Sequence, residues 1–185
     1  MGKRVCPWWV GYLLAIPVRR LIQDPGKILA PYVREGAIVL EPGPGMGFFT
    51  LELARRVGPN GRVIAVDVQP RMIASLKRRL KNAGLSERVD VRLAPPESMG
   101  LAGVAGSVDL VLAFAVVHEF PDAGSFFAEV GSALKPGGGV LLAEPLGHVK
   151  PAEFDAELEA AARVGLSAEA RPSIPRSHAA WLRKS

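Results

Sequence analysis

Residues Val39 to Phe49, VLEPGPGMGFF, place three glycines at alternate positions (Gly43, Gly45 and Gly47) directly behind an apolar run. A carboxylate, Glu41, precedes the first glycine, and a helical pattern follows the last. In open α/β proteins, a glycine-rich turn after the first strand directs backbone N–H groups and a helix N-terminus at a bound ligand. The stretch therefore predicts both a fold class and a ligand site.

Short apolar runs on either side of this turn have the length and composition of buried parallel strands. We expect strands at residues 37–40, 63–66, 89–93, 108–114 and 140–143. Helical patterns separate them, at 48–57, 70–83, 123–134 and 151–164, and the third breaks at Lys135-Pro-Gly-Gly-Gly. This alternation predicts right-handed crossovers and a doubly wound, mostly parallel sheet.

The C-terminal tail departs from the alternation. Ala168–Ser173 and Ala179–Arg183 are joined by Pro-Arg-Ser-His and predict a hairpin that adds an antiparallel strand to the sheet. With it, the chain has the seven strands of a Rossmann-like fold. Because 185 residues suit one domain, we expect a helical cap at 1–35 and a core at 36–185.

The composition is that of a globular protein, with 49% hydrophobic and 22% charged residues. A single cysteine, Cys6, excludes a disulfide framework and a multi-thiolate metal site, and it suits a reducing compartment. We therefore predict a cytoplasmic protein without a bound metal.

The net charge of +5 does not point to a nucleic-acid partner. The basic residues are spread along the chain, and no dense basic run with interleaved aromatic residues occurs. We interpret them as solvated helix faces.

The N-terminus holds an apolar run from Val5 to Val18 behind two basic residues. No small-residue cleavage site follows it, and it is shorter than the roughly 20 apolar residues that span a bilayer. We expect a helix that packs on the domain rather than an integral membrane segment. Shallow membrane contact through Trp8, Trp9 and Tyr12 is the alternative.

The residues around the glycine loop limit the class of ligand that it can bind. A dinucleotide fingerprint needs a third glycine at position 48, which is Phe48, and no phosphate-binding Gly-Lys-Ser/Thr is present. Asp67, at the end of the second expected strand, is placed to accept the hydroxyls of a ribose. Glu41 would repel a pyrophosphate but favours an ammonium or sulfonium group.

Three motifs in order, EPGPGMG, VDV and LKPGGGVLLAE, resemble those of class I S-adenosylmethionine-dependent methyltransferases. The resemblance is greatest to small-molecule enzymes of the ubiquinone/menaquinone-biosynthesis and arsenite-methyltransferase type, and it covers about Ile28 to Glu144. One cysteine cannot build the multi-cysteine site of an arsenite enzyme, so we reject that activity.

The resemblance implies a set of cofactor-binding residues. The three glycines would line the methionine end of S-adenosylmethionine, Glu41 would lie near its amino group and Asp67 would hold the ribose. Val68 would pack on the adenine and Phe114 would lie under the methyl-donor region. The carboxylate that this family carries after the third strand is missing; the segment holds Ala94, Pro95 and Glu97, so Glu97 or a backbone carbonyl takes its place, or the adenine pocket differs.

Candidate residues for the chemistry follow the fourth strand. His118 is a candidate general base, oriented by a neighbouring acid, or a substrate contact, and Glu119 is a weaker catalytic candidate. Glu144 is another carboxylate at a strand end, whereas His148 and His178 are interpreted as surface or structural residues. Trp8, Trp9 and Tyr12 of the cap are candidates for shaping an apolar acceptor site.

The sequence thus predicts a methyltransferase for a small, apolar or aromatic acceptor, as a monomer or homodimer. Two alternatives stay open: an RNA or protein methyltransferase, and a module that binds S-adenosylmethionine without catalysis.

Overall fold

The computed structural model describes residues 19–95, 98–101 and 103–185. These residues form two compact units, an N-terminal unit that ends at Gly100 and a C-terminal unit that begins at Leu101. The cap residues Trp8, Trp9 and Tyr12, and the loop residue Glu97, lie outside the described residues.

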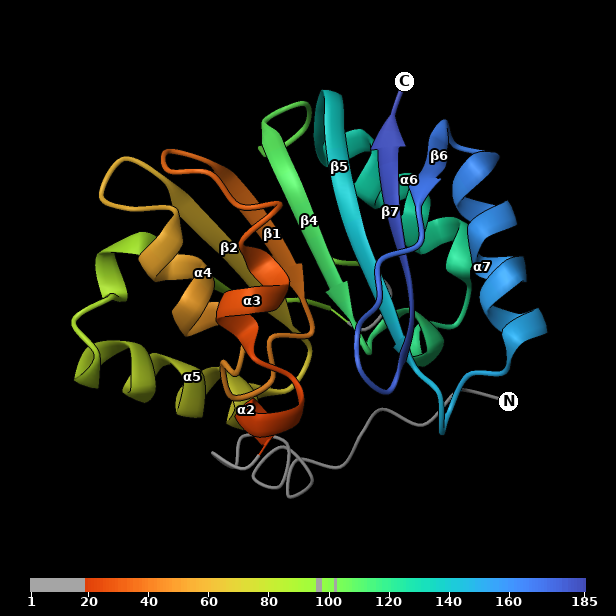
Figure 1. Ribbon diagram of the computed structural model, residues 1–185. Helices are drawn as coiled ribbons and strands as arrows, with labels where there is room; N and C mark the ends of the chain where they lie inside the picture. The colour runs from red at the N-terminus through yellow and green to blue at the C-terminus, as the bar shows by residue number, and fades with distance from the viewer. Residues whose placement is uncertain (1–18, 96–97, 102) are drawn as a thin grey trace. The chain divides into compact units, whose positions relative to one another are not determined.

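The N-terminal unit is a three-stranded parallel sheet with two of its helices packed on it (Figure 1). The strands follow the order β3-β2-β1, and α4 packs on β2 while α5 packs on β2 and β3. Its elements are α2 (Arg19–Ile22), α3 (Pro25–Leu29), β1 (Ile38–Pro42), α4 (Thr50–Arg56), β2 (Arg62–Asp67), α5 (Pro70–Asn82), η1 (Ser86–Arg88) and β3 (Val89–Leu93).

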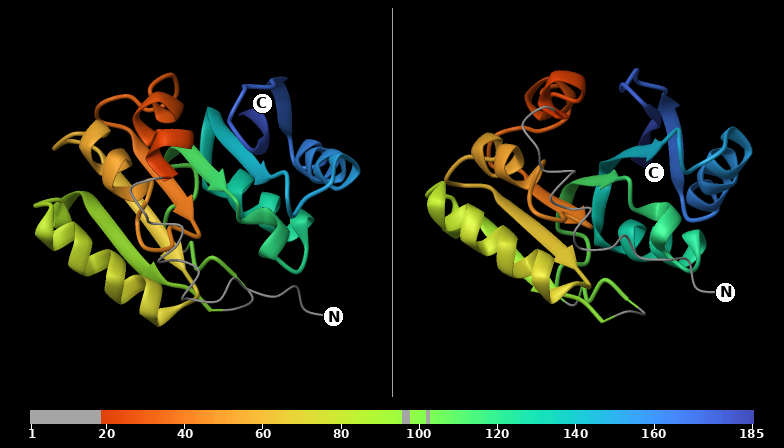
Figure 2. Two further views of the ribbon diagram at one scale, coloured as in Figure 1. Left: turned by 60° about the horizontal axis from the view of Figure 1, so that its bottom comes forward. Right: turned by 90° about the horizontal axis from the view of Figure 1, so that it is seen from below.

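The C-terminal unit contains four strands in the order β4-β5-β7-β6. β4 pairs with β5 in parallel, and β7 is antiparallel to both of its neighbours. The two long helices of this unit, α6 and α7, pack on each other, and α7 packs on β6 (Figures 1 and 2). The elements are β4 (Val108–Phe114), η2 (Val117–Glu119), α6 (Ala123–Ala133), β5 (Leu134–Pro145), α7 (Pro151–Ala162), β6 (Leu166–Ala170) and β7 (Ser177–Lys184).

Every strand and helix expected after Gly36 is present, and the C-terminal hairpin is confirmed. The main difference lies at Lys135-Pro-Gly-Gly-Gly, which we expected to be a break. It belongs to β5, where the pairing with β4 shifts between Val108 and Leu110. The glycines permit this irregularity, because Gly137 has a φ of 72° and a side chain at Gly139 would collide with the Trp181 ring.

Parallel strands bring their following loops to one edge of each sheet. In the N-terminal unit, the loops after β1, β2 and β3 share an edge. β1 ends at Pro42, opposite Val66 and one residue before the end of β2, and the last residues of β2 and β3, Asp67 and Leu93, are paired. In the C-terminal unit, the register Phe114↔Ala143 brings the loops after β4 and β5 together. The predicted site residues follow these strand ends.

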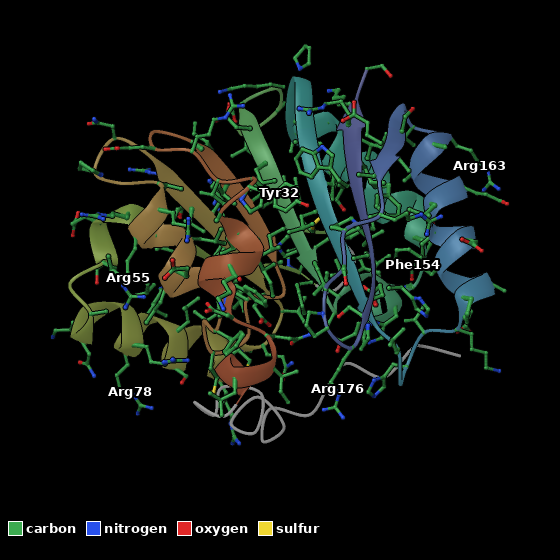
Figure 3. The ribbon with its side chains drawn as sticks, viewed as in Figure 1. Tyr32, Arg55, Arg78, Phe154, Arg163 and Arg176 are labelled. Atoms are coloured by element: carbon green, nitrogen blue, oxygen red, sulfur yellow. The ribbon has the colours of Figure 1, made fainter. Side chains whose placement is uncertain are left out.

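The basic side chains are distributed over many elements. Figure 3 labels Arg55 on α4, Arg78 on α5, Arg163 on α7 and Arg176 in the β6–β7 connection, and all four are exposed. No helix in the described part of the chain is long and apolar enough to cross a membrane.

Candidate functional site

The glycine loop of the N-terminal unit is held by its own backbone. Gly43 N donates to Val66 O at 2.9 Å, which continues the β1–β2 ladder by one bond, and Gly47 N donates to Pro44 O at 2.9 Å. Gly43, Gly45 and Gly47 all have positive φ, between 55° and 85°. Other residue types are strained in this region, so glycine is needed at each position.

The glycines of the loop nevertheless differ in what faces them. A Cβ at Gly45 would meet nothing within 4 Å, so the backbone there is open to a ligand. A Cβ at Gly47 would lie 2.5 Å from Leu76 and 2.8 Å from Leu51. Gly47 thus allows α4 and α5 to pack closely against the loop. The sequence pattern alone did not suggest this packing role.

Glu41 is a buried carboxylate just before the loop, with 4% of its surface exposed. Neither its Oε2 nor the buried Thr50 Oγ1 has a hydrogen-bond partner among the described residues. Burial raises the pKa of Glu41 to about 8; the nearby Thr50 hydroxyl opposes the rise and the charge of Asp67 adds to it. A cation bound here would favour the ionised carboxylate.

Asp67 ends β2 and is also buried. Burial raises its pKa, although backbone hydrogen bonds from Gln69, Gly45 and Val68 oppose the rise. Gln69 N donates to Asp67 Oδ1 at 2.8 Å. The hydrogen bond from the backbone of Gly45 joins this carboxylate to the glycine loop.

Apolar surface lies beside Asp67. Val68 is 39% exposed and Leu93, the register partner of Asp67, is 56% exposed. Ala94 is buried and its N–H donates to Asp67 O at 3.0 Å, while Pro95 is exposed. Leu93 was missed as a candidate because its place at a strand end gave no reason to expect exposure.

The C-terminal unit contains a second polar cluster, centred on Glu144 of β5. Glu144 is fully buried, and its Oε1 accepts hydrogen bonds from Val116 N at 3.0 Å and Val117 N at 2.9 Å. Its Oε2 is hydrogen-bonded to Nδ1 of His118. The acid that orients His118 is therefore Glu144 rather than its sequence neighbour Glu119.

Several groups act on His118. Burial alone lowers its pKa, but the hydrogen bond and charge of Glu144, with the charges of Glu119 and Glu157, outweigh burial and raise it. The ring of His148 stacks on it, with centroids 5.9 Å apart. His148 was predicted to be a surface residue and is exposed, but it also contributes this contact.

The remaining predicted residues have simpler surroundings. Phe114 is the last residue of β4 and is half-buried. His178 stacks on Phe154 of α7, the residue labelled in Figure 3, at 5.4 Å between ring centroids. This contact agrees with the structural role predicted for His178.

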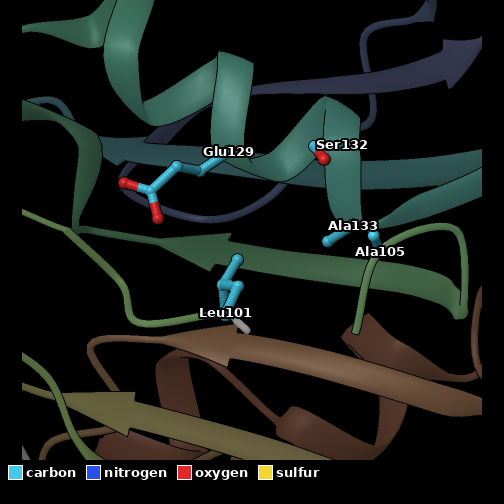
Figure 4. A pocket seen from close by; sticks show the side chains of 5 residues that line it. All are labelled: Leu101, Ala105, Glu129, Ser132 and Ala133. Atoms are coloured by element: carbon cyan, nitrogen blue, oxygen red, sulfur yellow. The ribbon is translucent and has the colours of Figure 1, made fainter. Parts of the chain in front are cut away.

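Figure 4 shows a hollow of the C-terminal unit that lies apart from this cluster. It is lined by Leu101, Ala105, Glu129, Ser132 and Ala133. Ala105 precedes β4 and Ala133 precedes β5, so the hollow lies at the amino ends of these strands, opposite His118. Within residues 19–95, 98–101 and 103–185, no group of three His, Cys, Asp or Glu side chains could hold a metal ion.

Comparisons with known structures identify the class of fold. A SAM-dependent methyltransferase from Aquifex aeolicus matches 98% of this chain and 100% of its own, with a TM-score of 0.86 and 24% identity. This likeness confirms the predicted α/β fold, a Rossmann-like methyltransferase fold with mostly parallel strands and an antiparallel C-terminal strand.

The family follows from the sequence comparison. Residues 34–172 match the family model described as a methyltransferase domain, and the chain belongs to that family. It is similar to a ubiquinone biosynthesis O-methyltransferase of Methylocella silvestris (36% identity over 59% of this chain and 40% of the relative). It is also similar to an arsenite methyltransferase of Halobacterium salinarum (33% over 59% and 27%). The chain spans less than half the length of either relative.

The different surroundings of Gly45 and Gly47 predict different effects of alanine. Both substitutions strain a left-handed residue by roughly 1 kcal/mol, but only Gly47→Ala also overpacks Leu51 and Leu76, at about 1–3 kcal/mol more. Urea unfolding without ligand should show the larger loss of stability for Gly47→Ala. Equal losses would contradict the packing role.

The raised pKa of Glu41 predicts a pH-dependent difference between the wild type and Glu41→Gln. A folded-state pKa of about 8, above the ordinary 4.5, gives stability that is complete below pH 4.5 and is lost as the pH rises to 8. Without ligand, the wild type should lose stability relative to Glu41→Gln by about 1 kcal/mol per pH unit between pH 5 and 8. Parallel urea-unfolding profiles over this range would show that Glu41 ionises normally.

Proposed function

We propose that this chain is an S-adenosylmethionine-dependent methyltransferase that acts on a small, apolar or aromatic acceptor. The observation that carries this proposal is the pair of buried carboxylates, Glu41 and Asp67, on either side of an open glycine loop. Two adjacent acids with raised pKa values suit a ligand that brings a positive charge and hydroxyl donors.

The residues present fit S-adenosylmethionine. Among the residues that the structure describes, the buried Oε2 of Glu41 has no hydrogen-bond partner, and the ammonium group of the cofactor would supply one. Gly45 leaves room for close approach of the methionine part, and Asp67 would accept from the ribose hydroxyls. Val68 and Leu93 offer exposed apolar surface for the adenine.

When bound, S-adenosylmethionine supplies an electrophilic methyl group on its sulfonium. The residues of this chain would bind and orient the reactants, because in-line displacement depends strongly on alignment. His118 would accept a proton from the acceptor, since its ring is held by a buried carboxylate and is still 23% exposed.

The identity of the acceptor does not follow from the relatives. Their names refer to ubiquinone biosynthesis and to arsenite, and the lone cysteine argues against arsenite here. A small acceptor and a cytoplasmic location remain our proposals. Salt-dependent RNA binding would instead favour the macromolecular alternative.

Removal of the Asp67 carboxylate tests the cofactor site. Asp67→Ala should weaken the binding of S-adenosylhomocysteine by about 10- to 100-fold, since a hydrogen bond to a charged group contributes roughly 1.5–3 kcal/mol. Asp90→Ala, which removes a partly exposed carboxylate paired with Arg92 on β3, is the matched control and should bind normally. Unchanged calorimetric affinity for Asp67→Ala would overturn the assignment.

Removal of the His118 ring tests the proposed base. His118→Ala should lower the rate of S-adenosylhomocysteine formation by about 10²-fold or more while cofactor affinity stays unchanged. A loss of cofactor binding instead would make His118 a binding residue. Bound cofactor without methyl transfer to any acceptor would support the non-catalytic module.

A further inference from the structure

Glu144 makes an unusually complete set of hydrogen bonds for a buried carboxylate. Both of its oxygens are used: Oε1 accepts from the N–H groups of Val116 and Val117, and Oε2 meets Nδ1 of His118. The side chain is completely shielded from solvent. Two backbone N–H groups and one imidazole nitrogen thus face the two oxygens of this carboxylate.

We propose that Glu144 is a positioning residue that keeps the proton of neutral His118 on Nδ1, so that Nε2 can take a proton from an aromatic or enolic hydroxyl of the acceptor. This inference rests on the proposed methyltransferase function. It assigns Glu144 as the residue that orients the base, and it names the chemical class of the acceptor.

The choice of ring nitrogen follows from hydrogen-bond chemistry. Carboxylate oxygens accept hydrogen bonds and an imidazole N–H donates, so we assign Nδ1 of His118 as the donor to Glu144. A neutral imidazole carries one N–H, and Nε2 is therefore left with a lone pair. The described residues offer Nε2 no hydrogen-bond partner, and the side chain is 23% exposed. The ring thus has one anchored nitrogen and one basic nitrogen that an acceptor can reach.

The backbone and a second ring fix the orientation of His118. Ala115 has a φ of 56°, an uncommon conformation for alanine, and its N–H donates to Ala143 O at 2.7 Å. This turn aims the next two N–H groups at Glu144. His148 stacks on the imidazole with an interplanar angle of 22°, so an edge and a face of the ring are both held.

The charges around His118 favour its protonated form. Glu144 contributes from β5, Glu119 from η2 and Glu157 from α7, while His148 provides the stacked ring. Together the three carboxylates raise the pKa of His118 despite its burial. Its conjugate acid is thereby stabilised, as needed for a group that receives a proton in the transition state.

The free Nε2 lone pair favours an acceptor that must lose a proton as it reacts. A phenolic hydroxyl, with a pKa of about 10, is mostly protonated at neutral pH and carries such a proton. An aliphatic hydroxyl is a much weaker acid than a phenol and holds its proton too tightly for an imidazole to remove it. A thiol, at about 8.5, ionises appreciably without help, and a neutral amine already has its lone pair.

The proposed step conserves atoms and charge. An electron pair of the acceptor oxygen forms the new O–C bond, and the electron pair of the broken C–S bond remains on sulfur. The hydroxyl proton passes to Nε2 of His118. The resulting imidazolium is paired with Glu144 until the proton leaves to solvent.

The tautomer of His118 can be measured in the wild type and in Glu144→Gln. In the variant, the amide oxygen can still accept from Val116 and Val117, but the amide NH₂ then faces Nδ1. The proton of the neutral ring should therefore move to Nε2, and the pKa of His118 should fall. Glu157→Gln, which removes a buried charge not bonded to the ring, is the matched control and should leave the tautomer unchanged.

Two-bond ¹H–¹⁵N correlation spectra, recorded over a range of pH, report both the tautomer and the pKa of His118. The chain has only three histidines to assign. A wild-type ring with its neutral proton on Nε2 would overturn the proposal without any variant. An unchanged tautomer and pKa in Glu144→Gln would also overturn it.

Matched acceptors test the chemical class. With 2-naphthol, 2-naphthalenethiol and 2-naphthylamine as probes, we expect methyl transfer to the naphthol oxygen. Glu144→Gln should lower that rate by about 10²-fold or more without changing the affinity for S-adenosylhomocysteine, and should move the acidic limb of the pH–rate profile to lower pH. Transfer only to the thiol or amine, to a ring carbon, or to none of the probes would overturn the acceptor class.

Different results would contradict the proposed methyltransferase function and the proposed role of Glu144. If the chain does not bind S-adenosylhomocysteine, the methyltransferase function fails whatever the state of His118. If it binds the cofactor but His118 has the other tautomer, only the role of Glu144 fails.

Discussion

The parallel pairing of β1 with β2 is the constraint on which the N-terminal site depends. It aligns Pro42 with Val66, so Glu41 and Asp67 reach the same sheet edge from different strands. The bond from Gly43 N to Val66 O extends the ladder into the glycine loop, and the backbone contact of Gly45 with Asp67 holds the loop there. Backbone geometry thus places two carboxylates next to each other even though burial and mutual repulsion oppose it.

Glu41 and Glu144 show how one residue type acquires opposite properties. Both are buried near the ends of strands. Glu41 has a pKa raised to about 8 and a buried oxygen to which no other described residue donates a hydrogen bond, so a ligand can complete its environment. Glu144 receives three hydrogen bonds from its own unit and needs no ligand. Partner count, rather than burial, separates a candidate binding residue from a positioning residue.

The sequence predicted what depends on periodicity and local residue type. The strands, the helices and the inward side chains of α5, such as Leu76 and Leu80, follow from apolar spacing. The strand-end positions of Glu41 and Asp67 follow from the same pattern. Gly47 shows the limit, because its neighbour Leu76 lies in another helix, and only the folded chain shows that this glycine permits packing.

The contact of His118 with Glu144 could not be predicted from the sequence. The two residues are 26 positions apart, and Glu119 was the acid that proximity in sequence suggested. The contact requires β4 and β5 to be parallel neighbours in the register Phe114↔Ala143, and then a turn at Ala115. A left-handed alanine is strained by roughly 1 kcal/mol, and a glycine there would relieve that strain. The chain instead stabilises this conformation with the bond to Ala143 and the two N–H bonds to Glu144. Strain that is held in this way next to a partly exposed imidazole is typical of a functional site rather than of a connection between a strand and a helix.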